Sequence, residues 1–468
     1  MSIGPLTKST IDALLKPDNW KCEWDRYFES TRIFGVSSAS ATIQGIVKAK
    51  KIHPSDPPLD MFFKIMPDID KIHPGENTEN RHIIEPFIYR YLTNLIYNNV
   101  TPNLMEYIGM IHCDDIIPII SLDPDLENRV SGWFEGTPYE DWDIEDAMAI
   151  SLKKGNIMLI ELGNGMSLSQ MIKDPSISLT INEFKTIIFQ IAYTLDQMAR
   201  VHIRHNDLHA GNVWINILDS PTKMVYQTAS GTFTIHTRYV AKIFDFDLSA
   251  YTYPGANASI RNYTLDDYFC HAHGMCQSPD LRFDLVTVMY SIYASVVKEE
   301  ISFETGAYKY NKINAKWVLT SNKGTPLPDK EQLRVYNEFI ESFFTDQGIT
   351  ELIYSKNHYT FAGRFCYDDQ MWQYDDGTVE FMPAKNKKNA SQPCDDVSVP
   401  ADYMRIFKDV MGTGYFDEFE STDAPEYTSI ELLNPFQTSR LNSFELLLEP
   451  SYLDAFDISS RPRHFDEL

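Results

Sequence analysis

Basic residues are scarce in this chain of 468 residues, in which 41 Lys and Arg stand against 66 Asp and Glu. The formal net charge is −25. Phosphate backbones and anionic membrane surfaces are bound through clustered positive charge, so this deficit argues against nucleic-acid binding and against a generic membrane-surface role. The acidity is compatible with a basic protein partner, although it more often serves solubility. We therefore expect no nucleic-acid partner.

Long apolar runs are also missing. No stretch reaches the roughly 20 apolar residues that span a bilayer. Residues 1–16 mix Ser, Thr, Lys and Asp instead of the charged and then apolar start of a secretory signal. Because 43% of the residues are apolar, the chain can bury a sizeable core. We expect a soluble, intracellular protein of one large or two moderate domains, without a transmembrane segment.

Cysteine is sparse, with six residues spread over the whole length. Such a distribution is not the disulfide framework of a small secreted domain, and it fits a reducing compartment. Four potential zinc ligands gather in one short segment: Cys270, His271, His273 and Cys276. They lack the usual pairs separated by a long gap. We favour a local loop or a redox-sensitive cysteine pair there, and zinc binding stays open.

Residues 205–212, His-Asn-Asp-Leu-His-Ala-Gly-Asn, are the most informative segment of the chain. They place Asp207 and Asn212 five positions apart. An Asp on a rigid loop can accept or orient the proton of an attacking hydroxyl, and an Asn can reach a magnesium ion that bridges nucleotide phosphates. Taken alone, the same spacing also fits a polar turn with an Asp cap.

A second motif supports the first. Residues 240–249, Val-Ala-Lys-Ile-Phe-Asp-Phe-Asp-Leu-Ser, predict a buried strand that delivers Asp245, although a strand-end turn has the same pattern. Magnesium prefers hard oxygen ligands and keeps phosphates and waters in its shell, so one carboxylate and one amide suffice. An apolar helical stretch over 184–198 precedes the first motif, and a strand over 213–215 follows it. The order helix, loop, strand, strand ending in Asp is what this chemistry requires.

These motifs resemble the protein-kinase-like superfamily, whose catalytic loop has the form His-x-Asp-Leu-x-x-x-Asn and whose metal motif is Asp-Phe-Gly. The resemblance implies an α+β, bilobal kinase-like fold with a small β-rich N-lobe and a larger, mainly helical C-lobe. It implies an N-lobe with an N-terminal extension over 1–162, a C-lobe over 163–414 and an acidic C-terminal tail over 415–468. ATP and Mg²⁺ are the implied cofactors, with Asp207 as base and Asn212 and Asp245 as metal ligands.

A kinase N-lobe also needs a loop over the phosphates and a strand Lys. Residues 33–47 predict strand, small-residue turn, strand, with Gly35, Ser37 and Ser38 placed where backbone N–H groups approach an anion. The loop departs from the glycine-rich pattern, and an ordinary hairpin is the alternative. Lys64 interrupts an apolar strand, and a lone buried ammonium is costly unless it meets a partner or phosphate. A Lys that faces solvent on an edge strand is its alternative.

The acidic partner of Lys64 is expected on a helix that follows. The candidates are Glu76, Glu79 and Glu85, and Glu85 is favoured. The next residue, Pro86, is comfortable only in the first turn of a helix. Glu85 is therefore expected at a helix start or a kink, with a capping charge as its alternative.

Two further parts complete the resemblance. Residues 156–165 predict a strand that ends in a Gly-containing connector and resembles the hinge between kinase lobes. By that resemblance, Glu161 and Leu162 present backbone groups to an adenine. Asp284 opens an apolar helix, and the resemblance implies that it bonds to the backbone of the catalytic loop; an N-cap role is compatible with this.

Departures from the common kinase pattern carry information on regulation. Asn206 stands where an Arg usually pairs with a phosphate on the activation segment, so activation by phosphorylation through that Arg is not expected. His209 stands where many Ser/Thr kinases place a Lys that touches the transferred phosphate. Asp247 replaces the Gly of Asp-Phe-Gly, which restricts the backbone and disfavours the usual flip of the motif. An Ala-Pro-Glu sequence is missing between Asp247 and Asp284. The pattern therefore supports phosphate chemistry more strongly than peptide docking.

The kind of kinase is the last question. The loop Asp-Leu-His-x-Gly-Asn is similar both to small-molecule kinases of the choline-kinase and aminoglycoside-phosphotransferase type and to haspin-like protein kinases. The motif over 244–249, the helix after Phe283 and the Tyr- and Asn-rich chain look like the divergent Ser/Thr protein kinases of large cytoplasmic DNA viruses, of the poxvirus virion kinase type. That resemblance covers about residues 33–295.

The viral resemblance implies a Ser/Thr protein kinase in the host cytoplasm, packaged in the virion and acting on viral structural proteins. Two alternatives stay open. One is a small-molecule kinase for aminoalcohols or aminoglycosides. The other is an inactive kinase-fold protein with a structural or scaffolding role.

Overall fold

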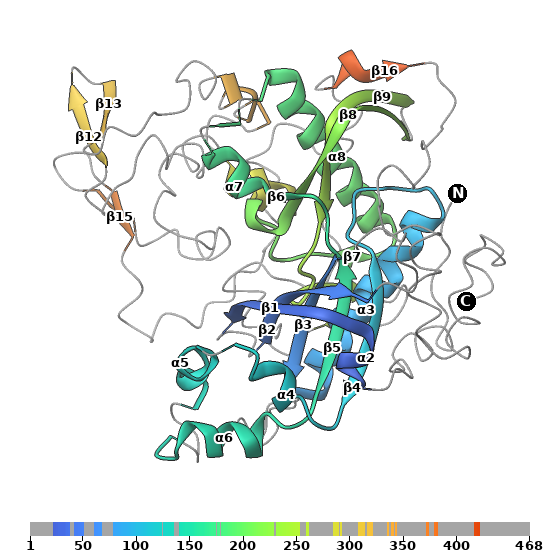
Figure 1. Cartoon of the computed structure of the whole chain (residues 1–468). Helices are drawn as coiled ribbons and strands as arrows, with labels where there is room; N and C mark the ends of the chain where they lie inside the picture. The colour runs from blue at the N-terminus through green and yellow to red at the C-terminus, as the bar shows by residue number, and fades with distance from the viewer. Residues whose placement is uncertain are drawn as a thin grey trace.

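Helices and antiparallel sheets occur together in this chain, so the fold is α+β as expected. One sheet has five strands. Figure 1 shows α4, α5 and α6 at one end of this sheet and β8, β9 and α8 at the other. Ser38 and the Cys270–Cys276 segment lie outside the described residues. The computed structural model describes residues 22–37, 42–50, 60–67, 78–123, 125–134, 140–174, 176–177, 179–228, 231–252, 259–261, 284–289, 291–292, 308–313, 316–321, 335–336, 338–340, 342–343, 371–373, 379–381 and 416–421.

The first sheet is antiparallel throughout, in the order β1-β2-β3-β5-β4. Its strands are β1 (Phe28–Ser37), β2 (Thr42–Ala49), β3 (Asp60–Pro67), β4 (Tyr107–Cys113) and β5 (Gly155–Glu161). Lys64 lies on the central strand β3, opposite Gln44 of β2 and Met158 of β5. At Gly45 the sheet leaves no room for a side chain, because a Cβ would lie 2.4 Å from the Phe63 ring and 2.5 Å from the Arg32 carbonyl oxygen. The backbone of Lys64 therefore belongs to a central strand that is closely packed against its neighbour β2.

Helix α3 (Thr78–Tyr97) follows β3. Its buried side chains include Ile88, Leu92 and Leu95, which are four and three residues apart and so lie on one face of the helix. The helix ends where Asn99 takes a left-handed φ of 54° and the Val100 N–H bonds to the Leu95 carbonyl at 2.8 Å, the pattern of a Schellman motif. Glu85 lies inside this helix and not at its start.

An insertion of short helices joins β4 to β5. It consists of α4 (Ile117–Ile120), α5 (Leu126–Val130), η1 (Ser131–Phe134) and α6 (Ile144–Ser151). Together with the preceding helix α2 (Trp24–Tyr27), these pieces form a hydrophobic cluster with one face of the first sheet, in which Trp24, Phe63 and Trp133 are buried. The short helices therefore cover one face of the first sheet, and residues of the second sheet belong to a different hydrophobic cluster.

The second sheet has the order β16-β9-β8-β6. It comprises β6 (Gly165–Ser167), β8 (Val213–Gln227), β9 (Thr232–Ile243) and β16 (Glu420–Ser421). The expected helix over 184–198 is confirmed as α8 (Ile181–Arg200), and the expected strand at 213–215 begins β8. Thr180 and Glu183 form a capping box at the start of α8, which satisfies two N–H groups of its first turn. The short helix α7 (Leu168–Lys173) contacts the end of the loop at 205–212, and α8 contacts the strand just before this loop.

Residues 416–421, at the start of the expected tail, lie against the second sheet. They form η7 (Asp417–Phe419) and β16, which pairs with β9. The Phe416 and Phe419 rings lie 5.2 and 5.8 Å from that of Phe189, and Lys185 Nζ lies 2.6 Å from Glu418 Oε1. Aromatic contacts and one ion pair thus hold this segment on α8.

Three smaller sheets complete the described part of the chain. β10 (Ala250–Thr252) pairs with β7 (Ile203–Arg204) and β11 (Ser259–Arg261), and β12 (Tyr308–Ile313) pairs with β13 (Lys316–Ser321). β14 (Met371–Gln373) pairs antiparallel with β15 (Val379–Phe381). Within the ranges described above, no helix is long and apolar enough to cross a membrane.

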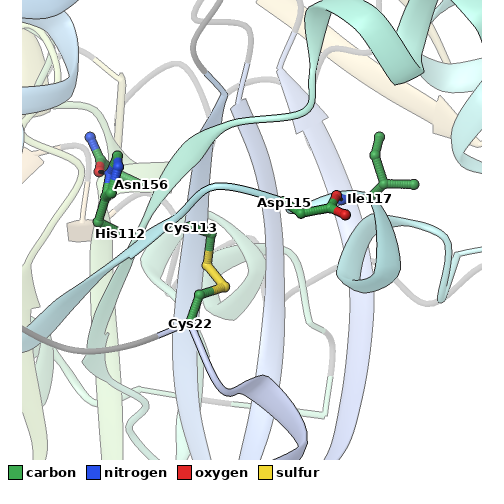
Figure 2. The surroundings of a disulfide bond; sticks show 6 residues. All are labelled: Cys22, His112, Cys113, Asp115, Ile117 and Asn156. Atoms are coloured by element: carbon green, nitrogen blue, oxygen red, sulfur yellow. Dashed lines mark hydrogen bonds between the residues drawn. A yellow bond between two sulfur atoms is a disulfide. The ribbon is translucent and has the colours of Figure 1, made fainter.

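One disulfide was not expected from the sequence. A disulfide joins Cys22, ahead of α2, to Cys113 at the end of β4 (Figure 2), with the two Cα atoms 5.0 Å apart. The residues are separated by 91 positions in sequence, and only the packing of α2 against the sheet brings them together. Because disulfides persist in oxidising surroundings, the cysteine content no longer supports a reducing compartment.

Candidate functional site

One buried ammonium group and three carboxylates meet between β3, α3 and the segment after β9. Lys64 Nζ lies 2.9 Å from Glu85 Oε2, 3.0 Å from Asp245 Oδ1 and 3.8 Å from Asp247 Oδ2. The side chains of Lys64 and Glu85 are only 2% and 3% exposed. The structure therefore brings together three residues that are far apart in sequence, and adds Asp247 to them.

The electrostatics of this cluster favour a positive charge. Burial lowers the pKa of Lys64, but Asp245, Glu85 and Asp247 more than offset it and hold that pKa well above its usual value. Burial raises the pKa of Glu85 to about 8, against the pull of Lys64. Burial and the nearby Asp245 raise the pKa of Asp247, whereas Lys64 keeps the pKa of Asp245 below its usual value in spite of burial. The single ammonium of Lys64 thus faces more than one carboxylate. A cation near Asp245 would reduce the repulsion between the carboxylates.

Asp284 anchors the loop that carries the first motif. Its two carboxylate oxygens accept hydrogen bonds from the backbone N–H groups of His205 and Asn206, both at 2.8 Å. Asn206 takes a left-handed φ of 68°, a conformation that costs a non-glycine residue on the order of 1 kcal/mol unless contacts hold it. The buried carboxylate of Asp284 supplies those contacts, as the resemblance to kinases implied.

The His205 ring links the loop to the metal motif. Its Nδ1 accepts a hydrogen bond from the Asp207 N–H at 3.3 Å, so in a neutral ring the proton is on Nε2, 3.0 Å from the carbonyl oxygen of Phe244. The backbone next to Asp207 is thereby tied to the residue before Asp245.

Asn212 ends the short 3₁₀ turn η2 (Ala210–Asn212). Its Nδ2 donates to the Asp207 carbonyl at 2.9 Å, and its own carbonyl accepts from the Phe244 N–H at 3.1 Å. The amide oxygen Oδ1 has no hydrogen-bond partner among the residues that the structure describes. The side chain is therefore oriented by its nitrogen, and its oxygen is left for a ligand.

Asp207 lies beside His209, with His209 Nε2 3.9 Å from Asp207 Oδ2. Burial and the neighbouring carboxylates of Asp247 and Asp245 raise the pKa of Asp207 to about 7, while His205 opposes the rise. Burial lowers the pKa of His209, so this imidazole is mainly neutral at pH 7. Asp207 is partly exposed and poised to exchange a proton near neutral pH.

The residues present fit a magnesium ion. Asn212 Oδ1 and the Asp245 carboxylate are hard oxygen donors on two adjacent segments, and Mg²⁺ is commonly bound by one or two carboxylates together with phosphates and waters. Within the described ranges, no group of three or more His, Cys, Asp or Glu side chains could hold a metal by itself. A metal held by Asn212 and Asp245 would therefore need further ligands, such as nucleotide phosphates and waters.

The remaining expected site residues that the structure describes lie on, or directly after, strands of the first sheet. Gly35 and Ser37 lie at the end of β1, which pairs with β2. Glu161 ends β5, and its N–H already donates to the Glu106 carbonyl at 2.9 Å, so only its carbonyl could meet an adenine amine. Leu162 follows it and is half-buried.

Three side chains with structural roles in the site were missed by the sequence analysis. The Tyr89 hydroxyl accepts a hydrogen bond from the Asp245 N–H, Asp247 joins the Lys64 cluster, and Lys242 forms an ion pair with Glu161. A signal existed for Tyr89, because it follows Glu85 by four positions and so shares its helix face. Lys242 stands alone within an apolar strand, the same pattern that singled out Lys64.

Two known proteins match part of this chain in sequence. No protein-family model matches the chain. A protein of Acanthamoeba polyphaga mimivirus with the provisional name of a serine/threonine-protein kinase is 28% identical over 184 residues, covering 36% of this chain and 37% of that protein. A Dictyostelium discoideum protein with a similarly provisional kinase name is 32% identical over 104 residues, covering 21% of this chain and 8% of that protein. The chain thus spans little more than a third of the mimivirus protein, and the likeness is to kinase-like phosphotransferases.

Proposed function

We propose that this protein is a Ser/Thr protein kinase that transfers the γ-phosphate of Mg-ATP to protein hydroxyls. The observation that carries the proposal is the contact of Lys64 with both Glu85 and Asp245. A buried strand Lys held by a helix Glu, beside the metal-binding Asp, is the arrangement that phosphoryl transfer in protein kinases requires. The small β-rich and larger C-terminal lobes of such kinases are part of this proposal.

Each residue has a chemical role in the proposed reaction. Lys64 contacts the α- and β-phosphates, and Asn212 and Asp245 hold Mg²⁺. The ion, when bound, neutralises charge on the phosphates. Asp207 orients the attacking hydroxyl and accepts its proton as the oxygen bonds to the γ-phosphorus and the bond to the ADP oxygen breaks. Gly35 and Ser37 lie over the phosphates, and Glu161 and Leu162 meet the adenine.

The protein-substrate class is supported by the names of the two relatives, both serine/threonine-protein kinases. The mimivirus relative also favours a viral setting, in which host cytoplasm or virion is the location and viral structural proteins are substrates. His209 beside Asp207 favours a second candidate, a small-molecule kinase, because a neutral imidazole replaces the Lys that contacts phosphate in many protein kinases.

Transfer from γ-labelled ATP tests the proposal. The full chain is incubated with Mg²⁺ and casein-like proteins, histones or a panel of aminoalcohols, and labelled products are separated. Label on Ser or Thr of a protein, lost in Asp207→Asn, is expected. Label on an aminoalcohol alone would establish the second candidate. Failure of millimolar Mg-ATP to raise the melting temperature would exclude nucleotide binding and leave a structural or scaffolding role.

A further inference from the structure

Tyr89 on α3 contacts the metal motif directly. Its hydroxyl oxygen accepts a hydrogen bond from the backbone N–H of Asp245 at 2.9 Å. Its ring packs edge-on against the ring of Phe246, with centroids 4.8 Å apart and planes at 83°. The side chain is 1% exposed. One buried tyrosine therefore touches two successive residues of the motif, through its polar end and through its ring.

The backbone that Tyr89 contacts is in a conformation that needs support. Asp245 has a φ of 67°, in the left-handed region that favours glycine. The motif over residues 244–249 contains no glycine. His205 Nε2 holds the Phe244 carbonyl on one side of the peptide unit at 3.0 Å, and the Tyr89 hydroxyl holds the Asp245 N–H on the other. Together they determine the direction of the Asp245 side chain.

Helix α3 thus reaches Asp245 by two routes. Glu85 holds Lys64, whose ammonium contacts Asp245 Oδ1. One helical turn later, Tyr89 holds the backbone of the same Asp245. The contact through Lys64 balances the charge of the Asp245 carboxylate. The contact through Tyr89 holds the Asp245 backbone in place.

We propose that Tyr89 is a positioning residue that couples the position of α3 to the orientation of the Asp245 carboxylate, and thereby sets the affinity of the site for its divalent cation. The inference rests on the proposed function, in which Asp245 is a metal ligand. It goes beyond it in assigning the control of metal affinity to a residue outside the catalytic motifs.

Tyr89→Phe is the direct test, because it removes the hydroxyl and keeps the ring against Phe246. The Mg²⁺ concentration that gives half-maximal transfer, and half-maximal thermal shift by ATP, is expected to rise about threefold to tenfold, the range that corresponds to one lost neutral hydrogen bond. At saturating Mg²⁺ kcat is expected to return close to the parental value. A variant with a generally disturbed fold would show no such rescue by metal.

Tyr91→Phe is the matched control. Tyr91 is a buried tyrosine on the same helix whose ring packs on Phe87 and Tyr251 and not on the metal motif. Its replacement is expected to leave the Mg²⁺ midpoint unchanged. If the parent shows a metal-dependent thermal shift with ATP and Tyr89→Phe has the same midpoint, the positioning role is wrong while the proposed function stands. If the parent shows no metal-dependent nucleotide binding, both are wrong.

Discussion

The ammonium of Lys242 lies 2.7 Å from Oε1 of Glu161, and both side chains are at most 1% exposed. Lys242 is on β9 of the second sheet and Glu161 ends β5 of the first. The Glu161 carboxylate also accepts the backbone N–H of Glu106 at 3.1 Å. This ion pair therefore joins the two sheets directly behind the segment proposed to meet the adenine.

Breaking this pair is expected to destabilise the protein strongly. Lys242→Met leaves the Glu161 carboxylate buried without its counter-charge, which costs about 3–5 kcal/mol when one partner of a buried pair is removed. The double variant Lys242→Met with Glu161→Leu removes both charges and is expected to regain most of that loss. Chemical denaturation of the parent and of these two variants measures the free energy of unfolding. A double variant less stable than Lys242→Met would contradict an essential pairing role.

The activity is expected to rise with pH toward a plateau, because the pKa of Asp207 is raised to about 7 and only its ionised form can accept a proton. The profile of kcat/KM against pH is expected to bend near that value. Asp207→Asn should abolish transfer and leave Mg-ATP binding largely intact, as measured by thermal shift. Transfer by Asp207→Asn at the parental rate would rule out its role.

The same group makes stability depend on pH. Asp207 binds a proton more tightly in the folded state than in the unfolded state, where its pKa lies near 4. Its contribution to stability is therefore greatest at low pH and falls as the pH rises from about 4 to about 7. Asp207→Asn cannot titrate, so its melting temperature relative to the parent should increase across that window. An unchanged difference between pH 4 and pH 8 would show that the site does not raise this pKa.

Activity is expected not to require phosphorylation. Asn206, in place of the usual Arg, donates from Nδ2 to the Leu248 carbonyl at 2.9 Å, and Ser249 Oγ donates to the His205 carbonyl at 3.3 Å. Neutral hydrogen bonds thus hold the segment after the metal motif without a phosphate. Phosphatase treatment should leave kcat unchanged, while Asn206→Ala should lower kcat severalfold. A phosphatase-sensitive parent would indicate another activating contact.

Reduction is expected to lower thermal stability through the Cys22–Cys113 bond. This disulfide closes a loop of 91 residues, and a disulfide typically stabilises by about 2–4 kcal/mol, chiefly by restricting the unfolded chain. The parent should melt at a lower temperature in reductant. The variant Cys22→Ala with Cys113→Ala should melt at that lower temperature in both conditions. A melting temperature that is insensitive to reductant in the parent would show that the bond does not form.

Several elements could be predicted because their signals are local. The apolar helical stretch that forms most of α8 and the strand that begins β8 each depend on residues close together in sequence. Glu85 was expected at a helix start or a kink, because Pro86 disfavours a helix interior, and the structure excludes the helix start. Tertiary packing overrode that preference, since the residues after Pro86 bury an apolar face against the core and α3 continues through it.

Contacts between distant segments could not be predicted in the same way. Three such contacts are the disulfide, the Lys242–Glu161 ion pair and the contact of Asp247 with Lys64. The residues in each contact are far apart in sequence, and no sequence pattern indicates that they meet. Residues 416–421 were expected in a tail, and the aromatic side chains that pack them on α8 gave no indication of their partner. Only the folded chain brings such surfaces together.

The sequence by itself determined the chemical groups of the site and their local spacing. Asp207 and Asn212 share one short loop, and Asp245 follows one strand at a distance of two residues, because turn and strand geometry are set by neighbouring residues. The tertiary structure decided which of these groups meet. It placed one ammonium among three carboxylates, raised the pKa of Asp207 by burial and set Tyr89 on the backbone of Asp245. Charge coupling and burial depend on distances through space, and these exist only once the sheets and α3 have packed.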